Sequence, residues 1–183
     1  IDNLNQRFKG FQDLMAKRVG NILLVSSLYD SFILAEDGQL SELMLSEYLD
    51  LNLRYAPGIT RVSSGEEALK AVRAGSKRYD LILVSSHLKD MNAREFARRA
   101  KREFINIPVI LLTFNARELA ELQVESSRNG LDGVFIWGGD FRILLAIVKL
   151  VEDRMNIDND ITTAGVQAII LVEDNVRFYS AYL

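Results

Sequence analysis

The sequence predicts an α/β protein built on a doubly wound parallel sheet of five strands, with one additional helix at the N-terminus. Short, continuous apolar runs recur along the chain, and segments with apolar residues at helical spacing lie between them. Continuous runs, unlike alternating ones, are typical of parallel strands that helices cover on both faces. Because the connections are short and helices follow the strands, we expect right-handed crossovers within one sheet.

In the first third of the chain the expected order is helix, strand, helix, strand. Residues 2–19 place apolar side chains at helical spacing and predict an amphipathic helix, and 22–25 is the first strand. A long connection, irregular at first and helical over 39–53, ends in the turn Pro57-Gly58. The second strand is expected at 59–62.

From Ser64 onward the signals are more regular. Ser64 and Glu67 form a capping box, in which a hydroxyl is followed by a carboxylate three residues on, and they predict a helix that ends at Ala74. The remaining strands are expected at 81–84, 109–112 and 134–137. The remaining helices are expected at 92–104, 115–128 and 140–155.

Composition excludes several classes of protein. Of the 183 residues 49% are hydrophobic, as in a globular protein, and the net charge of −3 argues against nucleic acid or anionic membrane as a partner. The chain has no cysteine, which excludes disulfides and thiolate metal sites and suits a reducing cytoplasm. The longest apolar run, 143–151, contains Lys149 and is too short to cross a bilayer. We expect a cytoplasmic location.

The first strand recurs near the C-terminus, but the two residues after it differ. Ser26 and Ser27 follow the first copy, whereas Glu173 and Asp174 follow the copy at 169–172. Two carboxylates after a strand favour Mg²⁺, which prefers oxygen ligands, and two serines do not. We therefore expect the first copy of the strand to belong to a domain that keeps its fold but has lost its metal site.

This repeat predicts three regions along the chain. Residues 1–18 form the N-terminal helix or linker, and 19–158 form one domain. Residues 159–183 form a linker and the first strand and helix of a truncated second domain, of which 168–172 is expected to add to a sheet edge or exchange with a neighbouring molecule.

Three segments resemble the receiver domain of response regulators, a CheY-like domain with a flavodoxin-like fold. The run Tyr79–Ala93 is similar to its third strand and loop, Asn106–Thr113 to its fourth strand, and Ser63–Leu69 to the start of its second helix. The resemblance covers roughly 19–155 and implies the strand order 2-1-3-4-5.

The same resemblance implies that the phosphorylation site is degenerate. Receivers accept a phosphoryl group on an aspartate that ends the third strand, and Ser85 stands there. Ser26 and Ser27 replace the acidic pair that holds the metal, and Trp137 replaces a lysine, so that of the switch positions only Thr113 keeps its usual hydroxyl. We therefore expect no catalytic residue, no metal and no cofactor in this domain.

Other residues near these loops have alternative interpretations. His87 could act as a base for Ser85, but a solvated loop histidine is the commoner case. Asp30, Asp37 or Asp90 could supply replacement carboxylates, although loop acids are mostly surface residues. The basic residues over 94–102 are expected to lie on the solvent-exposed face of a helix. Trp137 is expected to fill the volume that the lysine leaves.

The expected function is that of a pseudo-receiver, a non-catalytic regulatory module in two-component-type signalling. Its partners would be proteins, including downstream domains of the same chain, and a homodimer is possible through the stripes of 2–19 and 141–151. With the second copy at 166–174, the arrangement resembles the N-terminal part of large bacterial proteins of the phosphoenolpyruvate synthase type. Two alternatives stay open: a receiver phosphorylated at a non-standard site in a phosphorelay, and a small-molecule sensor using the remodelled pocket.

Overall fold

A computed structural model of the chain describes residues 14–27, 40–50, 56–114, 130–138, 140–165, 167 and 179–180. Its strands are β1 (Asn21–Val25), β2 (Gly58–Val62), β3 (Leu81–Ser85), β4 (Val109–Thr113) and β5 (Gly133–Ile136). Its helices are α2 (Leu40–Asp50), α3 (Gly65–Ala74), α4 (Ala93–Glu103) and α6 (Arg142–Ala164). The helix expected at 115–128 lies outside the described residues. None of the described helices is long and apolar enough to cross a membrane.

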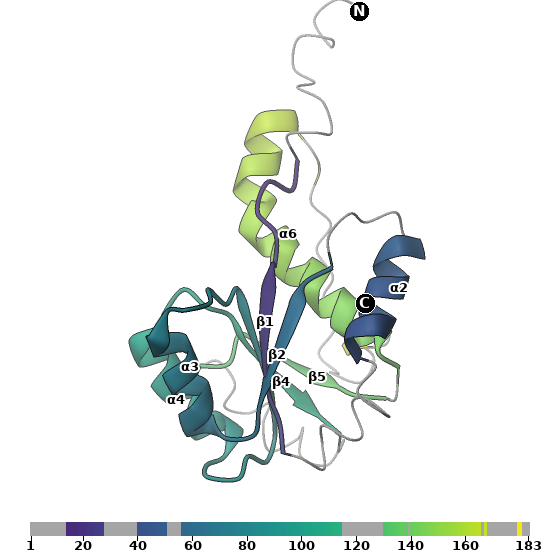
Figure 1. Cartoon of the computed structure of the whole chain (residues 1–183). Coiled ribbons are helices and arrows are strands. Elements are labelled where there is room, and N and C mark those ends of the chain that lie inside the picture. Colours follow the sequence, from purple (N-terminus) through teal and green to yellow (C-terminus); the bar gives the residue numbers. More distant parts are fainter. Residues whose placement is uncertain are drawn as a thin grey trace, which may run out of the picture.

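The five strands form one parallel sheet in the order β2-β1-β3-β4-β5. Helices α3 and α4 cover one face, and α2 and α6 cover the other (Figure 1). This arrangement confirms the predicted doubly wound fold and its strand order. Since all strands are parallel, their carboxyl ends meet at one edge of the sheet. Helix α6 begins at this edge, and its C-terminal end lies far from it.

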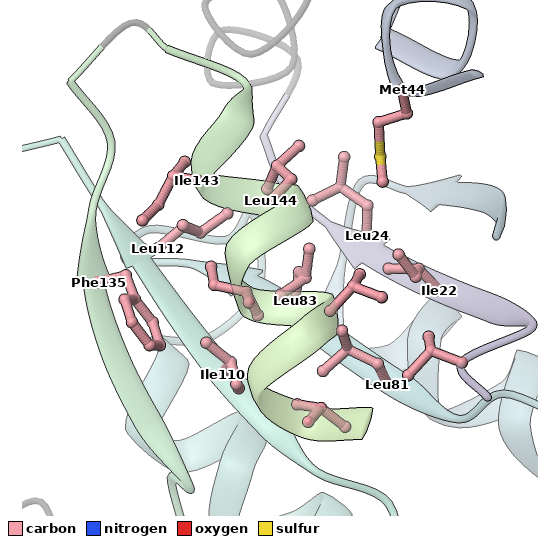
Figure 2. Close-up of a cluster of buried hydrophobic side chains, with 14 of the residues drawn as sticks. Ile22, Leu24, Met44, Leu81, Leu83, Ile110, Leu112, Phe135, Ile143 and Leu144 are labelled. Atoms are coloured by element: carbon pink, nitrogen blue, oxygen red, sulfur yellow. The ribbon is translucent and has the colours of Figure 1, made fainter. Parts of the chain in front are cut away.

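Two hydrophobic clusters fill the space between the sheet and its helices. Alternate strand residues such as Ile22, Leu24 and Leu83 meet α2 and α6 on one face (Figure 2). The residues between them, such as Leu23 and Val84, meet α3 and α4 on the other face. Strands buried on both faces explain why the sequence shows continuous apolar runs.

Local capping signals set the bounds of α3 and α4. The Ser64 hydroxyl accepts a hydrogen bond from the N–H of Glu67 at 3.2 Å, as the predicted capping box requires. Gly75 ends α3 with a φ of 62°, a left-handed conformation that glycine adopts without strain. Asn92 caps α4 by accepting from the N–H of Glu95 at 2.9 Å.

The prediction of a helix over residues 2–19 is wrong for its described part. Residues 1–13 lie outside the described chain, and residues 14–20 contain bends and irregular chain in place of a helix. Met15 has a φ of 54°, and the N–H groups of Met15, Lys17 and Val19 donate to side chains of α6. Those side-chain acceptors take the place of the carbonyls that a helix would have offered, while Val19 is buried in the core.

Helix α6 is longer than predicted. It continues past Met155 to Ala164, and Gly165 ends it with a φ of 64°. Residues 159–164, assigned above to a linker, are therefore helical. The C-cap glycine is the signal that marks this end in the sequence.

The apolar residues of 141–151 pack inside their own domain. Leu144, Val148 and Val151 are buried against the sheet, and Phe141 and Leu145 are partly buried beside them. They leave little apolar surface for the homodimer expected from this segment. Among the described residues, the large hydrophobic side chains that are exposed on helices are Leu45 and Leu49 on α2 and Ile157 and Ile161 on α6.

Part of the C-terminal segment contacts β5. The ring of Tyr179 lies 5.7 Å from that of Phe135, and the N–H of Ile136 donates to the Ser180 hydroxyl at 3.1 Å. Residues 168–172, expected to form an added strand, and Glu173 and Asp174 lie outside the described residues.

Candidate functional site

Three buried hydroxyl groups lie at the carboxyl ends of neighbouring strands. Ser26 follows β1, Ser85 ends β3 and Thr113 ends β4, and each side chain is at most 1% exposed. Val25 pairs with Val84 and Ser85 pairs with Leu112, so the register holds these ends side by side. The structure thus brings together three of the positions singled out in the sequence, in the part of the fold where ligands of such sheets bind.

Backbone hydrogen bonds fix the strand ends that carry these hydroxyls. The N–H of Ser26 donates to the carbonyl of Val62 at 3.1 Å, and the N–H of Trp137 donates to the carbonyl of Thr113 at 2.8 Å. The Ser85 hydroxyl lies 3.5 Å from the backbone carbonyl of His87 and donates to it. The serine hydroxyl therefore donates to a carbonyl of its own loop. The alternative in which His87 acts as a base for Ser85 stays a hypothesis.

Trp137 follows β5 at the same edge and is buried in the core on the α2 and α6 face. Its indole Nε1 has no hydrogen-bond partner in the described part of the chain. A buried, unsatisfied N–H costs about 1–3 kcal/mol, so burial of the large ring must offset that cost. This position agrees with a side chain that fills volume in the core.

Asp90 holds the loop after β3 against the start of α3. One carboxylate oxygen accepts from the N–H of Gly65 at 2.8 Å and the other from the N–H of Glu66 at 2.9 Å. Partial burial would raise the pKa of Asp90, but these backbone hydrogen bonds and nearby Arg99 outweigh it and lower the pKa below its ordinary value. Both oxygens cap a helix, so the structure gives Asp90 a structural role in place of the metal-binding alternative.

Two basic residues of α4 are engaged with neighbouring acids and carbonyls. Arg99 pairs with Glu66 on α3, and Lys101 lies 2.7 Å from Asp132 and 2.9 Å from the carbonyl of Ile107. Arg98 and Arg102 are exposed. These pairs support the interpretation of the helix as a solvated face that also links α3, α4 and β5.

The edge formed by the three hydroxyls carries no acidic group among its described strand-end residues. Across the described ranges there is also no group of three or more histidine or acidic side chains placed to hold a metal ion. Asp30 and Asp37 lie outside the described residues. The chemistry this edge can offer is hydrogen bonding by neutral hydroxyls, because a serine without an adjacent base is a poor nucleophile.

Sequence reasoning missed one polar cluster, on the outer part of α6. Glu152, Asn156 and Asp160 are all buried, although they belong to residue types that are mostly exposed. Their spacing of four places them on one helix face, and this spacing is the signal that could have found them. Because the sequence predicts a helix that ends at Met155, Asn156 and Asp160 fall outside the predicted element.

Comparisons with known proteins agree with this geometry at the level of the fold. No protein-family model matches the chain, and no curated protein matches it by sequence. Solved structures match: a two-component response regulator from Clostridium difficile is 22% identical with a TM-score of 0.56, and the match covers 75% of this chain and 98% of that one.

Two further solved structures are similar to this chain to the same degree. The phosphorylated cyanobacterial phytochrome response regulator RcpA is 22% identical over 75% of this chain and 93% of that one, with a TM-score of 0.54. The signal receiver domain of an HD domain-containing protein from Pseudomonas fluorescens Pf-5 is 18% identical over 79% of this chain and 95% of that one, with a TM-score of 0.53. At these identities the likeness shows the fold, which is that of CheY-like receiver domains.

Proposed function

We propose that this chain contains a pseudo-receiver, a regulatory module of two-component-type signalling that works through protein interfaces without accepting a phosphoryl group. The observation that supports it most is the neutral edge of the sheet. The receiver fold is present, but Ser26 and Ser85 offer buried hydroxyls where the family uses carboxylates, and Thr113 adds the hydroxyl that the family also has.

Phosphoryl transfer to a receiver uses a carboxylate nucleophile, a divalent cation and a fixed positive charge that meet at one point, because negative charge on the phosphoryl oxygens has to be neutralised. Ser85 offers an alcohol, Ser26 and Ser27 offer no negative charge for a cation, and Trp137 offers no positive charge. Each missing group alone would slow the reaction, and together they remove its basis.

A module of this kind would act through surfaces that bind other proteins. We propose that its partners are proteins of a bacterial cytoplasm, including other domains of the same chain. The exposed Leu45 and Leu49 on α2 and Ile157 and Ile161 on α6 are the apolar side chains available for such contacts among the described helices. A homodimer through these residues is one form of this proposal.

Fluorescence of Trp137, the single tryptophan, would test the absence of a cation site. Trp137 is buried at the same sheet edge as the three hydroxyls, so a cation bound there would alter its surroundings. We expect its emission and the melting temperature to be unchanged by millimolar Mg²⁺, with Ca²⁺ giving the same result.

The matched control restores the acids with the triple variant Ser26→Glu, Ser27→Asp and Ser85→Asp. Three carboxylates at adjacent strand ends form a ligand set that Mg²⁺ prefers, so this variant should gain a saturable, Mg²⁺-dependent rise in melting temperature. A saturable response of the unmodified chain would contradict the proposal and favour a site rebuilt from other carboxylates.

A further inference from the structure

The outer part of α6 projects beyond the sheet, and little of the core supports it (Figure 1). Val151 is the last residue of α6 that is buried in the hydrophobic core, and Met155 packs only partly against it. The following residues, Ile157 to Thr163, are β-branched residues, Asp and Asn, all of them poor helix formers. Neither the core nor intrinsic propensity explains why the helix continues to Ala164.

The N-terminal segment 15–19 runs beside this part of the helix and is bound to it through backbone groups. The N–H of Val19 donates to Glu152 at 3.0 Å and that of Lys17 to Asn156 at 2.8 Å. The N–H of Met15 donates to both carboxylate oxygens of Asp160, at 3.1 and 3.3 Å. Asn156 also donates to the carbonyl of Lys17 at 2.7 Å.

The contacts repeat at regular intervals along both elements, because every second N–H of the segment, at Met15, Lys17 and Val19, donates to a residue four positions from the last on α6. Residues four apart on a helix rise about 6 Å along its axis. Each N–H that points toward α6 therefore meets the next polar residue of the stripe formed by Glu152, Asn156 and Asp160.

Charges next to the first contact compensate the buried carboxylate. Lys149 lies 2.8 Å from Glu152, and Arg18 lies 3.5 Å from it. Glu152 is 2% exposed, and a buried carboxylate is tolerated only with such partners. The Asp160 carboxylate is also buried, and it accepts a further hydrogen bond from the Asn159 amide at 2.9 Å. The segment is thus recognised through its main chain.

We propose that the segment 15–19 is a strap that sets the length of α6. With the strap bound, the polar stripe is satisfied and the helix runs to Ala164; with the strap displaced, the helix frays back to about Met155. Met15 is bound to Asp160, within the last five residues of α6, so displacement of the strap changes the end of the helix. This device does not depend on the proposed function, because the strap lies away from the hydroxyl edge.

Hydrogen exchange of the full 183-residue chain, followed by mass spectrometry, would test the strap. Lys17→Pro removes the N–H that Asn156 accepts, whereas the control Lys17→Ala changes the exposed side chain and keeps that N–H. We expect about ten-fold faster exchange over 157–164 in Lys17→Pro, no change over 143–150, and no change anywhere in Lys17→Ala. Unchanged exchange over 157–164, or equally faster exchange over 143–150, would overturn the proposal.

Asp160→Ala gives a second test, in which two explanations predict opposite signs. Alanine is the best helix former, so a helix that is stable on its own would exchange more slowly over 157–164. A helix that depends on the strap would exchange faster, because the N–H of Met15 loses its acceptor. Faster exchange over 157–164 in Asp160→Ala supports the strap, and slower exchange contradicts it. This test remains decisive even if the Lys17→Pro variant does not fold.

Discussion

Replacing Ser85 with aspartate, the residue that receivers use at this position, is expected to destabilise the protein by about 3–4 kcal/mol at pH 7. The Ser85 side chain is 1% exposed, and the strand-end residues beside it are serines, a threonine and a tryptophan. Among the described strand-end residues, no positively charged side chain stands beside a carboxylate at this position. Its pKa in the folded state would rise to about 7 or above, while the unfolded chain keeps a value near 4.

The direction of the pH dependence follows from that difference. Below about pH 4 the carboxyl is neutral in both states, and Ser85→Asp should lose little more stability than Ser85→Asn, the matched neutral control. As pH rises, the unfolded chain ionises first, so the free energy of unfolding of the aspartate variant falls progressively up to the raised pKa. Urea denaturation of both variants between pH 4 and pH 8 measures this pH dependence of the free energy of unfolding. Equal stability at pH 7 would mean that a compensating positive charge reaches this edge.

Replacing Phe96 with alanine is expected to have the largest effect on the fold, about 3–5 kcal/mol. Phe96 is fully buried on α4 and belongs to the cluster that joins α4 to the sheet. Alanine removes most of a ring that neighbours on rigid strands cannot replace, so a cavity remains. Urea denaturation gives the change in the free energy of unfolding.

Ile105→Ala is the matched control for Phe96→Ala. Ile105 follows the same helix but is 75% exposed, so its truncation should change stability by no more than about 0.5 kcal/mol. A loss at Phe96 as small as that at Ile105 would mean that α4 contributes little to the cooperative unit, against the packing described here.

The sheet could be predicted because each strand is encoded locally. Runs such as Ile22–Val25 and Leu81–Val84 are apolar at every position, because helices cover both faces of these strands. Ser64 and Asn92 mark helix starts by a short-range rule, and both cap as that rule requires. The candidate site followed from the same information, because Ser26, Ser85 and Thr113 come directly after predicted strands.

The N-terminal segment and the end of α6 could not be predicted by the same means. The spacing of Leu14, Met15 and Val19 fits a helix, and nothing local reveals that side chains more than a hundred positions away accept hydrogen bonds from this backbone. Conversely, Ile157 to Thr163 is poor in helix formers, so local propensity argued against the helix that long-range contacts stabilise. Asp90 shows the same limit, since its role as a cap depends on α3 lying beside its loop.

Intact-mass spectrometry after incubation with acetyl phosphate and Mg²⁺ tests the central claim most directly. A receiver with an intact site should gain the mass of one phosphoryl group, and a responsive receiver treated in parallel shows that the reagent is active. We expect the mass of this chain to stay unchanged. A stoichiometric phosphoryl adduct would contradict the account, and its position, mapped by fragmentation, would identify the residue that carries the chemistry in place of Ser85.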